Sequence, residues 1–285
     1  MRRAYQSIDL WSVAPKPARL RRVMARARPP SSAVDNASMS ETPWFEAAFR
    51  ADYLAVYAHR DQASATREVA FLVEQGLRGR VLDLCCGQGR HLIAMRAAGL
   101  WAHGLDLSHE LLVRAPRLEG GESTSGRLVR GDQRALPFAD ASHDAVALLF
   151  SSFGYHDDAG DLRVLREVRR ILRPGGQVFL DLMNPARIRA SLVPHSQRER
   201  QGVLLEETRS LSPDGRRVRK RVVMRRVDGG GERSWHEDVR LYEPDELDAA
   251  LASAGLTPTA RFADFQGAPF GADAERQLVR AEAHA

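Results

Sequence analysis

The chain has 285 residues and is 44% hydrophobic, which is enough to bury one large core or a core with a lid. No apolar run approaches the roughly 20 residues that a spanning helix needs, so we expect a soluble, cytoplasmic chain with no membrane partner. The net charge is +5, but residues 1–38 alone carry eight basic and two acidic side chains, which leaves −1 for the remainder. Because the positive charge is confined to one end, nucleic acid is an unfavoured partner for the folded body.

The two cysteines, Cys85 and Cys86, are adjacent and cannot join distant parts of a fold. This usage indicates a reducing compartment and small core side chains rather than metal ligands. His143, His156 and His195 are scattered with no helical pairing, so no metal site is expected.

Residues 1–38 are rich in Arg, Pro, Ala and Ser and show no sustained apolar periodicity, which predicts a disordered basic tail. Two other interpretations stay open: an Arg-rich targeting segment, or a true start at Met39, because patterned sequence begins just after it. Residues 39–285 are assigned to one folded domain.

Aromatic and aliphatic residues recur at helical spacing from Trp44 to Tyr57, and a second helix is predicted over 64–75. Strands then alternate with helices, which predicts a parallel sheet with right-handed crossovers. The predicted strands lie at 81–84, 101–105, 127–130, 145–150 and 177–182, and the helices between them at 90–98, 108–115 and 162–172.

Residues 202–241 break this alternation. Three strands, at 202–208, 217–226 and 234–241, are joined by the strong turn signals of residues 212–215 and 228–231. A helix over 243–254 and strands near 257–264 and 276–283 finish the chain. The fold class is therefore α/β, a doubly wound, mostly parallel seven-stranded sheet with an antiparallel three-stranded insertion. The Arg-rich stretch 216–221 reads as a solvated face, with an acidic-substrate or RNA contact as the alternative.

The central chemical signal is Val-Leu-Asp-Leu-Cys-Cys-Gly-Gln-Gly-Arg-His, residues 81–91, at a predicted strand-to-helix turn. Gly87 and Gly89 let a ligand lie against the backbone, where helix amides point at it. Asp106 follows the next strand, about 20 residues further on, where a carboxylate can accept both ribose hydroxyls of an adenosine.

A dinucleotide fingerprint would have a third glycine where this chain has Leu92. Asp83 also disfavours a pyrophosphate beside the turn, but suits a ligand with an ammonium or sulfonium charge. A nucleotide-cofactor oxidoreductase is therefore the weaker hypothesis. Arg90 and His91 either cap the helix or contact the ligand.

The run from Asp83 to His91 resembles the first motif of class I S-adenosylmethionine-dependent methyltransferases, and residues 104–108 resemble the second. Further matches follow in order at 131–138, 144–155 and 172–176, so the resemblance covers roughly residues 42–285. It implies a Rossmann-like fold, S-adenosyl-L-methionine as cofactor and methyl transfer as activity.

The resemblance also implies roles for particular residues. Asp83 and Gly87 would lie near the methionine moiety, Gly89 against the cofactor backbone, Asp106 on the ribose, and Asp132 and Gln133 beside the adenine. The remaining residues of the expected cofactor set are Cys85, Leu107 and Phe150. Tyr53, Tyr57 and Arg60 match no fixed motif but lie where such enzymes often cover the cofactor.

Methyl transfer from a sulfonium needs an aligned nucleophile, and a general base only where the acceptor must lose a proton. Tyr155 and His156, just beyond the fourth strand, are the catalytic candidates, because ligands sit outside the carboxyl ends of parallel strands. Tyr242 and Asn184 are weaker ones. The expected acceptor is a small molecule with a nitrogen, oxygen or carbon nucleophile; the alternatives are RNA, a protein, or a cofactor-binding module without turnover.

The insertion is expected to form a lid over the acceptor while contributing little to adenosine binding. Its strands could instead pair with another subunit, since edge strands readily do so. The chain is expected to be a monomer or a homodimer.

Overall fold

A computed structural model describes residues 43–50, 53–57, 61–200 and 202–284. The predicted basic tail, Met39 and Arg60 lie outside these residues. The helices in this part of the chain are all too short or too polar to cross a bilayer.

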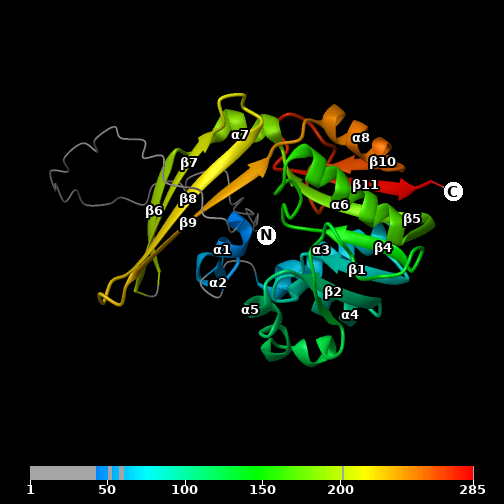
Figure 1. The fold of residues 1–285 in the computed structure, drawn as a ribbon, viewed down its shortest axis with the longest axis horizontal. Coiled ribbons are helices and arrows are strands. Elements are labelled where there is room, and N and C mark those ends of the chain that lie inside the picture. The colour runs from blue at the N-terminus through cyan, green and yellow to red at the C-terminus, as the bar shows by residue number, and fades with distance from the viewer. Residues whose placement is uncertain (1–42, 51–52, 58–60, 201, 285) are drawn as a thin grey trace, which may run out of the picture.

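The larger sheet has seven strands in the order β10-β11-β5-β4-β1-β2-β3 (Figure 1). β1 pairs in parallel with both β2 and β4, and β3 and β5 extend the parallel sheet on either side. β11 lies antiparallel between β5 and β10. The strands are β1 (Arg80–Leu84), β2 (Trp101–Asp106), β3 (Leu128–Arg130), β4 (His143–Leu148), β5 (Leu172–Met183), β10 (Leu256–Phe262) and β11 (Arg276–Ala283). The seven-stranded, mostly parallel sheet predicted from the sequence is confirmed.

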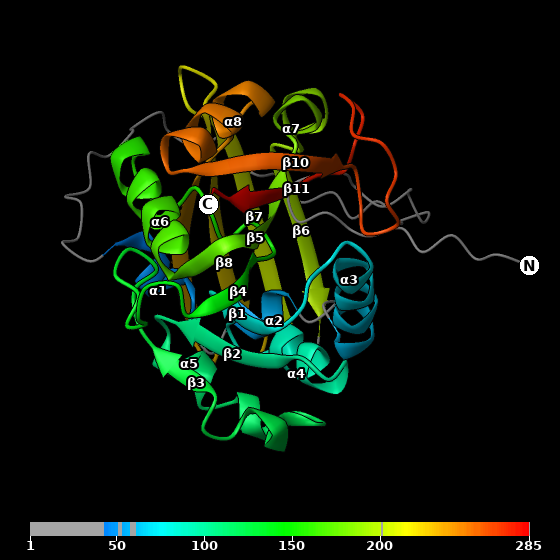
Figure 2. The same cartoon turned by 90° about the vertical axis from the view of Figure 1, so that its right-hand side faces the viewer.

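Helices cover both faces of this sheet (Figure 2). On one face, α6 (Asp158–Ile171) and α8 (Pro244–Ser253) pack on the core around Leu148 and Leu180. On the other, α3 (Gln62–Glu74) and α4 (Arg90–Ala97) pack around Val81 and Ala147. The strand order therefore reverses between β1 and β4, and in such sheets the ligand crevice lies outside the carboxyl ends of the strands at this point.

Two predicted helices are shorter in the structure than the sequence pattern suggested. The stretch from Trp44 to Tyr57 contains α1 (Trp44–Ala48) and α2 (Tyr53–Val56), with residues 51–52 undescribed between them. The helix expected over 108–115 is α5 (His109–Leu112), followed by two 3-10 turns, η1 (Ala115–Arg117) and η2 (Gly121–Thr124). Pro116 accounts for this early end, because it lacks an amide hydrogen and clashes with a continuing α-helix.

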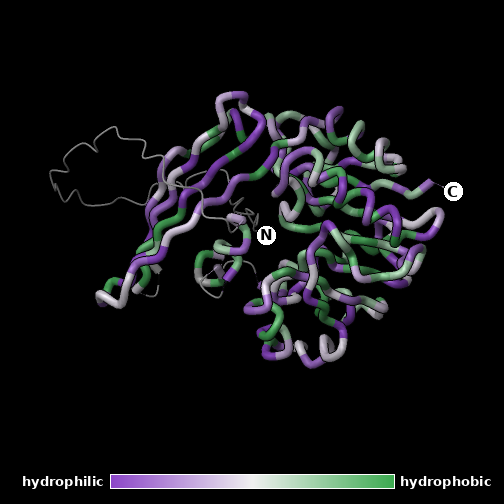
Figure 3. The backbone as a smooth tube through the Cα atoms, viewed as in Figure 1, coloured by the Kyte–Doolittle hydropathy of each residue, from purple (hydrophilic) through white to green (hydrophobic). Residues whose placement is uncertain are grey.

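The insertion follows β5 and α7 (Pro185–Ser191) and forms a separate antiparallel sheet in the order β6-β7-β8-β9. Its strands are β6 (His195–Arg200), β7 (Val203–Leu211), β8 (Arg217–Arg226) and β9 (Glu232–Arg240). The predicted antiparallel insertion is confirmed, with one strand more than expected. The additional strand is β6, whose sequence, His-Ser-Gln-Arg-Glu-Arg, has no apolar alternation that could reveal it (Figure 3).

One face of the insertion packs on α1 and α2. Val56 and Tyr57 form a buried cluster with Leu205, Val222 and Trp235 of the insertion. Figure 1 shows α1 and α2 between the antiparallel sheet and the larger sheet. The insertion therefore supports the N-terminal helices on their side away from the doubly wound body.

The Arg-rich stretch 216–221 is only partly the solvated face expected from the sequence. Arg219 and Arg221 are exposed, but Lys220 is buried and Arg217 is half-buried. Side chains alternate across a strand, so this stretch presents charge to both faces of the insertion.

Candidate cofactor and acceptor site

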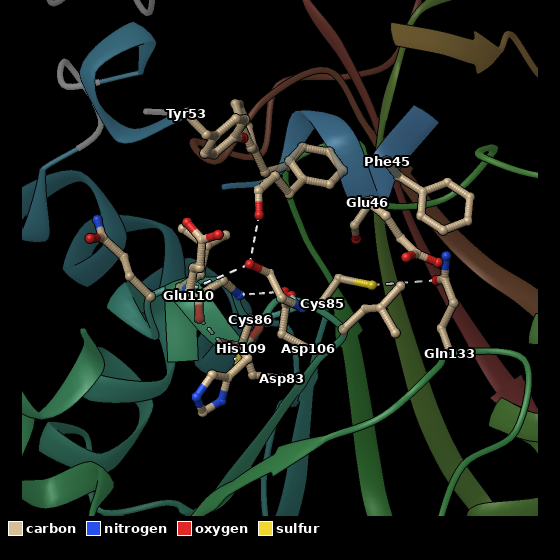
Figure 4. A pocket seen from close by; sticks show the side chains of 18 of the residues that line it. Phe45, Glu46, Tyr53, Asp83, Cys85, Cys86, Asp106, His109, Glu110 and Gln133 are labelled. Atoms are coloured by element: carbon tan, nitrogen blue, oxygen red, sulfur yellow. Dashed lines mark hydrogen bonds between the residues drawn. The ribbon is translucent and has the colours of Figure 1, made fainter. Parts of the chain in front are cut away.

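A cavity of about 560 Å³ lies at the carboxyl ends of β1, β2 and β4. Residues of the N-terminal helices face the end of β1 and the turn after it across this cavity. Figure 4 shows Phe45, Glu46 and Tyr53 on one side and Asp83, Cys85 and Asp106 on the other. The end of β2, residues 130–133 and residues 149–156 complete the wall. Its size is within the range of small-molecule and cofactor sites.

The predicted cofactor residues that line this cavity are Asp83, Cys85, Gly87, Asp106, Leu107, Asp132, Gln133 and Phe150, and both catalytic candidates, Tyr155 and His156, line it too. Gly89 is outside the lining. It is the N-cap of α4 with φ of 80°, and a Cβ there would lie 3.3 Å from the Cβ of Ala115. The structure thus gives Gly89 a role in the turn and in packing.

Two charged side chains in the wall each keep a buried atom with no hydrogen-bond partner among the described residues: Oδ2 of Asp83 and Nη2 of Arg90. Burial raises the pKa of Asp83 to about 7, and Asp106 adds to this, while the Arg90 charge and the Leu92 amide act in the opposite direction. A free acidic oxygen and a free guanidinium nitrogen in one cavity suit a ligand with an ammonium and a carboxylate.

Asp106 is fixed by the two turns beside it. Its Oδ2 accepts a hydrogen bond from the Gly87 amide at 2.7 Å, and its Oδ1 accepts one from the Ser108 amide at 2.7 Å. Burial raises the pKa of Asp106, and these amide bonds oppose the rise. Each carboxylate oxygen has a second lone pair, so a held carboxylate at the cavity wall can still accept from a diol.

Gln133 connects two other predicted residues. Its Oε1 accepts from the Cys85 thiol at 3.5 Å, and its amide nitrogen lies 3.3 Å from Nε2 of His156. Burial, helped by the charge of Asp106, raises the pKa of Cys85 well above its ordinary value, so this cysteine stays a thiol and is no nucleophile. Asp132 pairs with Arg134 at 2.6 Å. Partial burial of Asp132 acts to raise its pKa, but the hydrogen bonds and charge of Arg134 outweigh it, so the pKa of Asp132 is lowered.

The segment after β4 has a strained backbone. Phe150 and Ser151 adopt φ values of 63° and 55°, which are uncommon for residues with side chains. Asp181 accepts from the Phe150 amide at 2.7 Å through Oδ2, and its carbonyl accepts from the Ser151 amide at 2.8 Å. Arg276 donates to Asp181 Oδ1 at 2.6 Å and to Ser151 Oγ at 2.9 Å. A buried ion pair thus sets the turn that brings Phe150 to the cavity.

The two catalytic candidates differ in what they can do. Tyr155 lies against Phe49, with ring centres 5.6 Å apart, and burial raises its pKa well above the ordinary value. Burial and the charge of Arg134 instead lower the pKa of His156. At neutral pH Tyr155 therefore keeps its proton, whereas His156 is an uncharged imidazole. Arg217 of the insertion donates to the backbone carbonyl of His156 at 2.9 Å.

The weaker candidates lie elsewhere. The Tyr242 hydroxyl donates to Asp161 Oδ2 at 3.0 Å, and the Asn184 side-chain amide donates to the carbonyls of Gly271 and Ala274. Neither residue lines the cavity. Both roles are structural.

Phe45 and Phe49, which the sequence showed only as part of a helical apolar pattern, line the cavity, as do Tyr53 and Tyr57. The Ser108 hydroxyl donates to the Phe49 carbonyl at 2.6 Å, and this bond connects the segment after α1 with the end of β2. The helical spacing of these aromatic residues predicted that one face of the segment is buried. The sequence did not show that the insertion packs on the other face and so lets aromatic side chains line the cavity.

Comparison with known proteins agrees with this geometry. Residues 81–176 match a sequence family described as "Methyltransferase domain". The malonyl-[acyl-carrier protein] O-methyltransferase of Erwinia pyrifoliae is 38% identical over 104 residues, which are 36% of this chain and 37% of that protein. The demethylmenaquinone methyltransferase of Bacillus velezensis is 38% identical over 103 residues, 35% of this chain and 43% of that protein. The matched part spans less than half the length of these relatives.

Among solved structures, the CcbJ methyltransferase from Streptomyces caelestis superposes with a TM-score of 0.71 at 22% identity, covering 84% of this chain and 99% of that one. The sugar N-methyltransferase KedS8 from a Streptoalloteichus species has a TM-score of 0.60 at 24% identity, covering 92% and 100%. Both structures share the Rossmann-like fold of this chain. Residues 81–176 match a methyltransferase domain, and the resemblance to class I S-adenosylmethionine-dependent methyltransferases seen in the sequence is confirmed.

Proposed function

We propose that this chain transfers a methyl group from S-adenosyl-L-methionine to a small-molecule acceptor. The observation that carries the proposal is the pair of unpartnered buried atoms, on Asp83 and Arg90, in a cavity whose wall also holds Asp106 by two amides. These groups match an amino-acid end and a ribose in one ligand, and S-adenosyl-L-methionine has both. The relatives' names differ in the acceptor, so nitrogen, oxygen and carbon nucleophiles all remain candidates.

Each residue has a definite part in this proposal. The cofactor, when bound, supplies an electrophilic methyl group on a sulfonium. Asp83 and Arg90 would hold its amino-acid end, Asp106 and Leu107 its ribose, and Asp132 and Gln133 its adenine. Cys85 and Phe150 would close the wall beside it. Most of the rate then comes from holding the acceptor in line and excluding water, worth about 7–11 kcal/mol at best.

Calorimetry on the purified protein tests the cofactor. We expect binding of S-adenosylmethionine and of its demethylated product, with no measurable binding of NAD, because Asp83 disfavours a pyrophosphate. Tight NAD binding with none for the sulfonium would refute the proposal. Labelled cofactor incubated with fractionated cell extract, sorted into small molecules, RNA and protein, then separates our acceptor class from the two alternatives.

His156 is the general base in this proposal for an acceptor that must lose a proton, and Tyr155 is a hydrogen-bond donor and part of the wall. His156→Gln should lower kcat by about 100-fold for such an acceptor, at the low end of general-base effects. The base acts in its neutral form and its pKa is lowered. At saturating S-adenosylmethionine, where the titration of Asp83 in the free protein does not limit the rate, the wild-type kcat should therefore fall as the pH drops through a value below 6.5. The variant should lose this dependence.

His236→Gln, on the exposed outer face of β9, is the matched control and should keep both the rate and the pH profile. An unchanged acid limb in the His156 variant would show that another group takes the proton.

We also propose that residues 202–241 act as a lid. Arg217 contacts the segment after β4, and the insertion supports α1 and α2 over the cavity. A cytoplasmic location and a monomeric or homodimeric state complete the proposal; the near-neutral charge outside residues 1–38 supports a small molecule over nucleic acid.

A further inference from the structure

Lys220 is fully buried although it lies in the most basic strand of the chain, β8. Burial of a lysine charge is costly unless the charge is paired and hydrogen-bonded. The neighbouring Arg219 and Arg221 point to the exposed outer face instead. The position of Lys220 therefore depends on what its ammonium group meets on the inner face of the insertion.

The partners of Lys220 form a network of ion pairs and hydrogen bonds. Its Nζ lies 2.8 Å from Glu237 Oε2 and 3.8 Å from Glu207 Oε1, and it donates to the hydroxyl of Tyr57. That hydroxyl donates to Glu237 Oε1 at 3.0 Å, and Trp235 donates to the same oxygen at 3.1 Å. The hydroxyl of Tyr57 thus accepts from one residue of the insertion and donates to another, which fixes its position.

The ring of Tyr57 lies where two cavities meet. It lines the main cavity and also a small hollow next to it, which Glu237 and Arg276 line from the other side. Its ring centre is 4.3 Å from that of Tyr53 and 5.9 Å from that of Phe150. A shift of this ring would open the cavity toward the insertion.

Two further contacts hold the same helices by their backbone. Arg198 donates to the Val56 carbonyl at 2.8 Å, and Arg233 donates to the Ala47 carbonyl at 2.6 Å. Basic side chains of the insertion therefore reach the N-terminal segment at several points, and Lys220 reaches a side chain that itself lines the cavity.

We propose that Lys220 is a positioning residue, which holds the Tyr57 ring as the wall of the cavity by fixing its hydroxyl between Lys220 and Glu237. The inference rests on the proposed function in taking this cavity as the cofactor site. It assigns a role to a residue that touches neither cofactor nor acceptor. A purely structural lysine would affect folding stability without affecting the rate at which a ligand leaves the cavity.

The test uses Tyr57→Phe, which removes only the hydroxyl and leaves Lys220 with Glu237, and Lys220→Met, which removes the charge. Arg219→Met, a charge removed from the outer face of the same strand, is the matched control. Hydrogen exchange is measured on the ligand-free protein, in peptides that contain Tyr57. We expect at least fivefold faster exchange in both test variants and no change in the control.

The dissociation rate of S-adenosylmethionine is the second measurement, and it should rise about fivefold in Tyr57→Phe and stay unchanged in Arg219→Met, under conditions where urea unfolding shows each variant to be folded. A hydrogen-exchange rate within twofold of the wild type in Tyr57→Phe would show that the bonds of the Tyr57 hydroxyl do not fix this segment, even if Lys220→Met fails to fold. Faster exchange with an unchanged dissociation rate overturns the positioning role. If the wild type binds no S-adenosylmethionine, the proposed function fails, and hydrogen exchange still decides whether Lys220 and Glu237 hold the Tyr57 segment in place.

Discussion

Replacing residues 204–240 by a short Gly/Ser linker should abolish methyl transfer. The change removes the inner face on which Val56 and Tyr57 pack, and it removes Arg217, which holds the carbonyl of His156. Cofactor affinity should change by less than about tenfold, or 1.4 kcal/mol, because within the described chain no residue of the insertion lines the main cavity. Calorimetry and the labelled-methyl assay measure the two effects separately.

The same variant distinguishes a lid from a subunit interface. β6 is an edge strand of the insertion, and such edges can pair with another chain. Original activity in the shortened protein would disprove the lid, and a change from dimer to monomer with activity intact would favour the interface.

Asp106→Asn should weaken S-adenosylmethionine binding by more than about 100-fold. The carboxylate accepts two amide hydrogen bonds, from Gly87 and Ser108, and an amide side chain can accept at only one of its two ends. Hydrogen bonds to a charged group contribute about 1.5–3 kcal/mol each, so the loss of one of them together with a ribose contact accounts for the factor. Calorimetry on the folded variant measures it.

Asp140→Asn is the matched control, since the Asp140 side chain is 79% exposed and pairs with Arg170 away from the cavity. Its affinity should equal that of the wild type. An Asp106 variant that binds within threefold of the wild type would remove this carboxylate from the cofactor site.

The sequence brought together the residues proposed to hold the cofactor, because their positions follow from local pattern. Asp83 and Gly87 stand at a strand-to-helix turn, and Asp106 ends the next strand, so the parallel pairing of β1 with β2 brings them together. Strand order and spacing are enough to place such residues at one edge.

The acceptor side depends on contacts that are distant in the chain, and no periodicity reveals them. Asp181 interrupts an apolar strand and Arg276 begins another, and only the pairing of β11 with β5 shows that they meet. The same holds for Tyr57 and Lys220, which are 163 residues apart. A polar residue within an apolar strand was the available signal for Asp181, whereas Lys220 lies among arginines on β8 and has no such signal.

The turn at Phe150 and Ser151 has a consequence for which parts of the chain can change in sequence without altering the proposed cofactor residues. Residues 81–176 contain the residues proposed to hold the cofactor. The ion pair that sets the turn, Asp181 with Arg276, lies outside this segment, and so do α1 and α2. The shape of the cavity beside residues 81–176 therefore depends on contacts made by residues outside this segment. Under the proposed function, we expect substitutions in the surrounding parts to change which nucleophile reaches the methyl group while the proposed cofactor contacts stay the same.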